Sequence, residues 1–376
     1  MIEQLFISSL LSALLLGQIG RIELFGKLVN GYIQDPVMFL FILYLVIRHG
    51  LKPFKQVLKR NVSLFLTGTI IFSFLLSLLE FTIIENAVSL LFLLRIAMYG
   101  TLGIYLHFIA EKEKYTRIFI EKALKIFSVL LILISFAQYF FYSNFWGFYA
   151  FGWDPHMYRM SATYLDVYVA AALYGILALY WYGKKNILFT LIFVICLVLS
   201  FSRSSYIAFL LSAFLFLILN KQWKQLTITV LLFALFVFVA PKPFGEGVSL
   251  MRTSSVYSRI HDYQTAITIW EKKPLFGYGY NRIRYAKERL HLLANDDITH
   301  AASAFHSSFL IILATTGIVG LLAFFLALMQ YGITHQSIAS TLFFICIMSL
   351  FDNALLHVLV LLPLILVGSI SSIKSK

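Results

Sequence analysis

The chain has 376 residues, of which 60% are hydrophobic and only 12% charged, with a mean hydropathy of +0.87. A soluble domain carries roughly a quarter charged residues, so a fold that left this much apolar surface in water is excluded. The net charge of +13 comes without any nucleic-acid-binding motif, which excludes nucleic acid as a partner. We predict one all-α integral membrane domain over residues 1–376.

Apolar runs long enough to cross a membrane follow one another along most of the chain. They occur at about 4–20, 32–47, 62–79, 86–109, 123–142, 163–182, 187–201, 205–219, 226–240, 306–330, 336–351 and 353–370. These runs predict a polytopic bundle of about twelve transmembrane helices, with the first segment retained because no basic region or cleavage site of a signal peptide accompanies it.

The distribution of lysine and arginine orients this bundle. The even-numbered connections and the C-terminal tail hold most of the basic residues of short loops, whereas the short odd-numbered connections hold only Arg21, Lys27, Arg159 and Arg203. The positive-inside rule therefore predicts that both termini are cytoplasmic.

A long outside connection at 241–305, between the ninth and tenth spans, is the exception to this rule. Its basic residues are Lys242, Arg252, Arg259, Lys272, Lys273, Arg282, Arg284, Lys287 and Arg289. Cations on the disfavoured side do not serve topology, so we expect an anionic ligand outside the cytoplasm.

Arg203 lies in a tight outside turn, Ser200-Phe201-Ser202-Arg203-Ser204-Ser205-Tyr206, between two apolar runs. The turn holds it at the membrane surface, where it could bind a ligand or simply extend toward phosphate headgroups.

An amphipathic helix is predicted early in the long connection. Apolar residues recur there at Val256, Ile260, Tyr263, Ile267 and Trp270, and Ser254 or Ser255 is a plausible N-cap. Arg259 falls at the edge of this apolar face, where it could reach a cleft at headgroup level or pair with Asp262 three residues on.

A proline–glycine motif follows this helix. Its residues, Lys272-Lys273-Pro274-Leu275-Phe276-Gly277-Tyr278-Gly279-Tyr280-Asn281, predict an irregular turn after the proline. Tyrosines 278 and 280 could stack on sugar rings there.

His306 is expected in the first turn of the tenth span, in Ala304-Phe305-His306-Ser307-Ser308-Phe309-Leu310. The positive end of the helix dipole would lower its pKa and keep the imidazole neutral, as a general base requires. A histidine at the interface without a chemical role is the alternative. Gly317 and Gly320 follow, and they predict close helix packing.

Weaker candidates complete the set. Arg95 falls inside the fourth span, where an ionisable residue is a functional candidate, and Asp166 could pair with it or with Arg159. Asp352 and Asn353 fit the last outer turn. Cys196 and Cys346 are expected as small buried apolar groups. The spacing of His291, His300 and His306 does not match that of metal ligands, so no metal or other cofactor is expected.

The order of these features resembles the O-antigen ligase/polymerase family over roughly 159–325. The resemblance rests on the Arg203 turn, the Ser-Arg-Ile and Trp270 of the long connection, Pro-Leu-Phe-Gly-Tyr-Gly, and His-Ser-Ser-Phe-Leu followed by Gly-x-x-Gly. Arg159-Met-Ser-Ala-Thr-Tyr also looks like the family's outer segment, although the Asn-Pro that often follows is missing. His306-Ser307 stands where His-Asn is common.

The resemblance implies a C-type membrane glycosyltransferase whose donor is an undecaprenyl-diphosphate-linked oligosaccharide. Arg203 and Arg259 would grip the diphosphate, His306 would activate the acceptor hydroxyl, and direct displacement would invert the anomeric carbon. Arg95, Arg159, Tyr278 and Tyr280 are further candidate contacts to the substrate. The site would lie on the periplasmic face of the bacterial inner membrane.

Three functions remain open. A surface-polysaccharide (O-antigen) polymerase, acting on a glycan acceptor, is favoured because the proline–glycine and histidine motifs look more like polymerase examples. An O-antigen ligase with a lipid A-core acceptor has the same chemistry. A membrane transporter is more remote, because the cations gather at the surface and no internal repeat is evident. Lipid surrounds the protein in each case, and a chain-length regulator is an optional protein partner of a polymerase.

Overall fold

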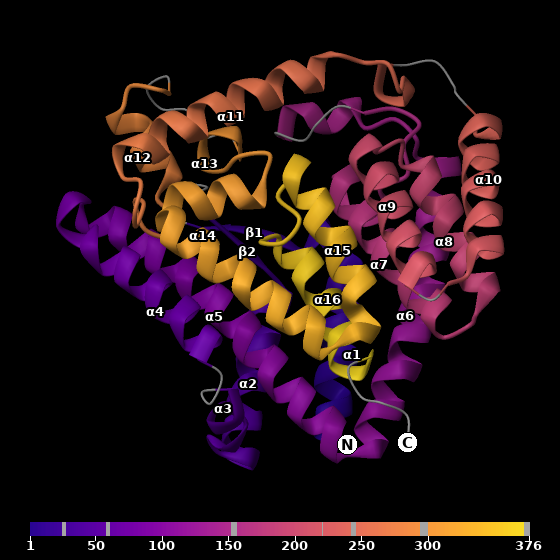
Figure 1. Cartoon of the computed structure of the whole chain (residues 1–376), viewed down its shortest axis with the longest axis horizontal. Coiled ribbons are helices and arrows are strands. Elements are labelled where there is room, and N and C mark those ends of the chain that lie inside the picture. Colours follow the sequence, from indigo (N-terminus) through magenta and orange to yellow (C-terminus); the bar gives the residue numbers. More distant parts are fainter. Residues whose placement is uncertain are drawn as a thin grey trace.

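A computed structural model of the chain describes residues 1–24, 28–57, 61–151, 156–219, 221–241, 246–293 and 300–371. The described residues form an α-helical bundle with one small hairpin (Figure 1). The helices of the bundle are α1 (Ile2–Leu16), α2 (Gln34–His49), α4 (Asn61–Leu76), α5 (Ile83–Lys112), α6 (Lys114–Phe141), α7 (Val167–Gly183), α8 (Ile187–Leu199), α9 (Arg203–Leu219), α10 (Trp223–Val239), α14 (Ser308–Thr334), α15 (Gln336–Phe351) and α16 (Val358–Ser371). The all-α membrane-type fold expected from composition is confirmed.

Each apolar run predicted as a span coincides with one of these helices. Four helical stretches are individually long and apolar enough to cross a membrane, at Ile2–Gly20, Asn61–Glu80, Ile83–Lys112 and Ser308–Thr334, and several shorter apolar helices accompany them. The chain is therefore a multi-pass membrane protein, and the count of about twelve crossings stays a prediction.

Local signals in the sequence begin and end these helices. Thr82 and Glu85 form a reciprocal capping box at the start of α5, and the Asp166 side chain accepts from the Tyr168 N–H at the start of α7. Asp166 thus caps a helix. Gly50, with a φ of 59°, ends α2 and leads into the short helix α3 (Lys52–Val57).

The helix α7 forms the centre of the bundle, because it packs against α8, α9, α15 and α16. Its residues from Val169 to Ala178 are all buried. Cys196 on α8 is buried nearby, as predicted, and Cys346 on α15 is partly buried. A smaller cluster of buried aromatic and aliphatic residues lies around Phe81, Tyr278, Tyr285 and Phe305.

Gly175 on α7 allows α15 to approach closely. A Cβ at this position would lie 2.0 Å from the Cζ of Phe344, whose side chain is fully buried. We expect Gly175→Ala to lower the free energy of unfolding by about 1–3 kcal/mol, because the ring has no space into which to move. Thermal unfolding in detergent measures this, with Gly100→Ala on α5 as the control, since a Cβ there meets nothing within 4 Å. Equal stability of the two variants would contradict the expectation.

The two ends of the bundle differ in structure. Figure 1 shows α11 (Ser254–Lys272), α12 (Ile283–Arg289) and α13 (His300–Ser303) covering one end, while α3, the start of α1 and the end of α16 lie toward the opposite one. The hairpin of β1 (Arg21–Leu24) and β2 (Val29–Tyr32) pairs antiparallel, with Arg21 opposite Tyr32. The arrangement agrees with the prediction that the 241–305 connection emerges opposite the termini, although its periplasmic placement is still a prediction.

Candidate functional site

Other arginines donate hydrogen bonds to backbone carbonyls of the turn that carries Arg203. Phe201 has a positive φ of 51° between the end of α8 and the start of α9. Arg159 donates from Nε to the Ser200 carbonyl at 2.9 Å and from Nη2 to the Phe201 carbonyl at 3.3 Å. Arg159 therefore supports the turn from which Arg203 projects, which is a structural role that the sequence did not predict.

Arg203 is half-buried and faces the connection that precedes α11. Its Nη1 donates to the carbonyls of Leu250 at 3.2 Å and Arg252 at 2.8 Å. It lies near enough to Arg259 for the two cations to repel each other. Two guanidinium groups held close together favour binding of an anion between or beside them.

Arg259 reaches inward from α11 to the connection between α15 and α16. Its Nε donates to the Phe351 carbonyl at 2.9 Å, and its Nη2 lies 3.2 and 3.1 Å from the two carboxylate oxygens of Asp352. The Ser204 hydroxyl donates to the same carboxylate at 3.0 Å. Nη1 of Arg259 is bonded to no described residue and is available to a ligand.

One detail predicted for α11, the residue at its N-cap, is wrong. The helix begins at Ser254 with Thr253 as N-cap and without a side-chain cap. The face of Val256, Ile260 and Ile267 is exposed, whereas the side buried against the protein is that of Asp262, Ala266 and Ile269. In a membrane protein an apolar residue gains nothing by turning away from lipid, so the apolar face does not mark the interior.

Asp262 holds His306. It does not form the ion pair with Arg259 that the sequence had allowed. The backbone N–H of His306 donates to Asp262 Oδ2 at 3.0 Å, and the ring Nδ1 bonds to the same oxygen. The carboxylate is nearly buried, while the imidazole remains 43% exposed. Nε2 of His306 is bonded to no described residue and is available to a ligand.

The predicted lowering of the His306 pKa is also wrong. The hydrogen bond that the His306 ring donates to Asp262 raises the pKa of His306 above its ordinary value, against burial and the charge of Arg259, which lower it. Asp352 raises it further. A carboxylate in contact with the ring carries a full charge, whereas a helix N-terminus carries about half a charge, so the carboxylate determines the direction. Burial would raise the pKa of Asp262, but the hydrogen bonds from His306 outweigh it and lower that pKa.

The structure thus assembles the three predicted catalytic residues at the end of the bundle covered by α11. Arg203 comes from the start of α9, Arg259 from α11, and His306 from the connection that precedes α14. Two acids missed as partners complete the cluster, since Asp352 anchors Arg259 and Asp262 anchors His306. Both basic groups are fixed on one side and open on the other. The spacing of Arg259 and Asp262 on α11 was the available signal, but it pointed to the wrong pairing.

The proline–glycine segment holds the helix that follows His306. The helix α14 is broken at Gly317, which has a φ of 67°, and a Cβ there would lie 2.2 Å from the Leu275 carbonyl. Backbone groups freed by the break bond to the segment through Tyr278 N–H to Ala314 O, Gly279 N–H to Thr315 O, Ile318 N–H to Pro274 O and Val319 N–H to Leu275 O. Gly317 therefore packs against a loop and not, as predicted, against another helix.

Arg95 and the two tyrosines are occupied elsewhere. Arg95 pairs with Asp35 at 2.9 Å and donates to the Asn30 carbonyl at 2.6 Å, so it secures the hairpin. Tyr280 is half-buried near Arg95, and desolvation of its hydroxyl raises its pKa to about 12. The Tyr278 ring is buried beside Phe81 and beneath Lys273. Among the described residues, the contacts of these three side chains are with other partners than Arg259 or His306.

Many cations of the 241–305 connection contact other residues of the protein. Their number alone is therefore a weaker reason to expect an anionic ligand. Arg282 is fully buried and donates to Asn86 at 2.5 Å, Arg289 pairs with Glu85 at 3.2 Å, and Lys273 pairs with Glu80. Lys242 lies outside the described residues. The expectation of an anionic ligand at this site therefore rests on Arg203 and Arg259, which lie near each other.

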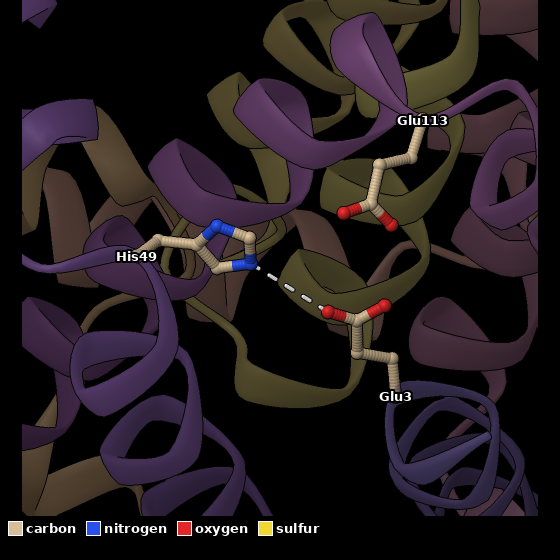
Figure 2. A group of neighbouring side chains, drawn as sticks. All are labelled: Glu3, His49 and Glu113. Atoms are coloured by element: carbon tan, nitrogen blue, oxygen red, sulfur yellow. Dashed lines mark ion pairs between the residues drawn. The ribbon is translucent and has the colours of Figure 1, made fainter.

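The described residues place a possible metal-ligand group far from this cluster. Their single set of three neighbouring histidine and carboxylate ligands is Glu3, His49 and Glu113 (Figure 2). These residues belong to the ends of α1, α2 and α5, at the end of the bundle opposite α11 (Figure 1).

Fold and site together define a multi-pass helical membrane protein with a histidine and two arginines clustered at one end. Residues 187–325 match the family model described as O-antigen ligase. The match covers α8 to most of α14 and includes Arg203, Arg259 and His306. This match supports the resemblance to the O-antigen ligase family that the sequence shows over the same part of the chain. A comparison with curated proteins gave no match. The family that this region matches implies a membrane glycosyltransferase-type enzyme of the ligase or polymerase kind.

Proposed function

We propose that the protein is an inverting, metal-independent glycosyltransferase that polymerises a surface polysaccharide from undecaprenyl-diphosphate-linked repeat units. One observation carries the proposal: in the described part of the chain nothing bonds to Arg259 Nη1 or His306 Nε2, while a carboxylate fixes the other side of each group. Such a site offers a cation for a leaving group and a base for a nucleophile without further rearrangement.

The proposed step is a direct displacement at the anomeric carbon of the donor. His306 Nε2 takes the proton from an acceptor hydroxyl as its oxygen forms the new bond to the anomeric carbon. The bond from that carbon to the diphosphate oxygen breaks, and the lipid diphosphate leaves with the electron pair. Arg203 and Arg259 stabilise the charge that develops on the diphosphate, which is the part a metal ion plays in other transferases.

Transfer to lipid A-core is the second candidate, because the family model that matches the chain is described as O-antigen ligase. The two reactions share donor, base and leaving group and differ only in the acceptor. The polymerase is preferred on the likeness of Pro274–Gly279 and His306–Leu310 to polymerase examples.

The test uses the purified full chain with a diphosphate-lipid-linked oligosaccharide, with and without a lipid A-core acceptor. A ladder of products without added acceptor supports the polymerase, whereas transfer only in the presence of the core supports the ligase. Absence of transfer under both conditions, together with transport of the lipid-linked sugar in vesicles, would contradict the proposal and favour a transporter. Activity that a chelator abolishes and a divalent ion restores would contradict its metal independence.

Asp262 should control the pH dependence of the reaction. The base acts only when His306 is neutral, so activity falls as the pH drops through the pKa of His306, which Asp262 raises. Asp262→Asn keeps a group of the same shape but removes the charge, so the acid limb of the rate profile should move to lower pH while the maximum rate falls. The loss of rate is expected because an amide no longer favours the tautomer that leaves Nε2 without a proton.

The same change can be measured without turnover. Modification of His306 by diethylpyrocarbonate, followed by mass spectrometry across pH, reports its pKa directly. His261, which is exposed on α11, serves as the internal reference. An unchanged modification profile for His306 in Asp262→Asn would show that the carboxylate does not set its pKa, whatever the reaction catalysed.

A further inference from the structure

A cavity of about 200 Å³ lies at the end of the bundle opposite the α11 cluster. It is lined by Arg48, His49, Lys52, Phe108, Ile109, Lys112 and Glu113. These residues come from the end of α2, the start of α3 and the end of α5. The lining carries more positive than negative charge, and its apolar floor is formed by two side chains that are almost completely buried.

The walls of this cavity are fixed by contacts that cross between helices. Arg48 pairs with the nearly buried Glu3 of α1 and lies 3.3 Å from Glu113, between the two carboxylates. The Tyr105 hydroxyl donates to the Gly50 carbonyl at 2.6 Å and so ties the turn between α2 and α3 to α5. The basic side chains are therefore presented by a rigid frame of four helices.

The same contacts argue against a metal ion at Glu3, His49 and Glu113. The three ligand atoms lie within 4.8 Å of one another, and Figure 2 shows His49 directed toward Glu3 with Glu113 close by. However, the Arg48 guanidinium already bridges the two carboxylates, which is the place a cation would take. A divalent ion would have to displace it and would then face its charge at short range.

Lysines 52 and 112 supply charge that the protein itself does not neutralise. Among the described residues, no carboxylate forms an ion pair with either, and the Lys112 ammonium lies 4.0 Å above the Phe108 ring. Ile47 and Leu51, which flank the cavity in sequence, are 77% and 63% exposed. Basic groups over an apolar floor, beside exposed apolar residues at the end of apolar helices, fit an amphiphile with an anionic head.

We propose that this cavity binds the phosphate group of an anionic phospholipid from the leaflet at this end of the bundle. The phosphate would lie between Lys52, Lys112 and Arg48, with the acyl chains leaving along Ile47 and Leu51. The site does not depend on the proposed transferase function. Because α2, α3 and α5 all contribute, a bound lipid stabilises the junction that these helices form with α1.

The test measures thermal unfolding of the purified full chain in a neutral detergent. Dioctanoyl-phosphatidylglycerol should raise the Tm of the wild-type protein, whereas dioctanoyl-phosphatidylcholine, which has no net charge, should not. Each lysine near a membrane phosphate contributes roughly a fivefold change in affinity. The double variant Lys52→Gln/Lys112→Gln should therefore need roughly 25-fold more lipid for the same rise.

The matched control is Lys55→Gln/Lys114→Gln, which removes two exposed lysines from the same region that do not line the cavity. Its response to phosphatidylglycerol should equal that of the wild type. An equal response of the two double variants, or of the wild type to both lipids, overturns the proposal. A full response to inorganic phosphate alone overturns the lipid as its source. A rise with Mn²⁺ or Mg²⁺ that Glu3→Gln abolishes overturns it in favour of a metal.

Discussion

His306→Ala should lower the rate of sugar transfer by about 10²–10⁴-fold, the usual contribution of a positioned general base. The reason is geometric, because Nδ1 is bonded to Asp262 and Nε2 is the ring atom that faces away from the protein contact. The measurement is the rate of product formation from the lipid-linked donor, with binding of donor followed separately. Donor affinity should change little, since the proton is transferred only in the reaction step.

His261→Ala is the control for this prediction. His261 lies next to Asp262 on α11, is exposed, and has no part in the cluster. It should keep full activity and the same thermal stability. If His306→Ala were as active as His261→Ala, the histidine would be an interfacial residue without a chemical role, which is the alternative that the sequence also allowed.

The helices were predictable because a membrane span is encoded within a single run of residues. The apolar stretch 86–109 falls within α5, the stretch 306–330 matches α14 except for its first two residues, and Pro274 follows the end of α11 as expected. Local rules also identified Arg203, Arg259 and His306, which the structure brings together. Each of them lies next to a helix start or in an amphipathic pattern that can be recognised from neighbouring residues.

The predictions that failed concern contacts between residues far apart in the chain. Asp262 and His306 are 44 positions apart, and Arg259 and Asp352 are 93 apart. Only the packing of α11 across the bundle decides which acid each base meets. The helix-dipole argument gave the wrong direction for the His306 pKa because it used only the local sequence.

Arg259→Gln should reduce transfer by about 10²–10³-fold, the usual cost of removing one donor that stabilises charge in a transition state. The substitution also leaves Asp352 buried without its cation, and breaking a buried pair costs about 3–5 kcal/mol of stability. A loss of activity in this variant alone therefore has two explanations. One is a missing contact to the diphosphate, and the other is a distorted site.

The double variant Arg259→Gln/Asp352→Asn separates these explanations. It removes both charges, so the amide at 352 can still accept from Ser204 and the thermal stability should largely recover. If Arg259 binds the leaving diphosphate through its open Nη1, activity stays low in spite of that recovery. If activity returns with stability, Arg259 serves only to neutralise Asp352, and Arg203 would be the one arginine left to hold the diphosphate.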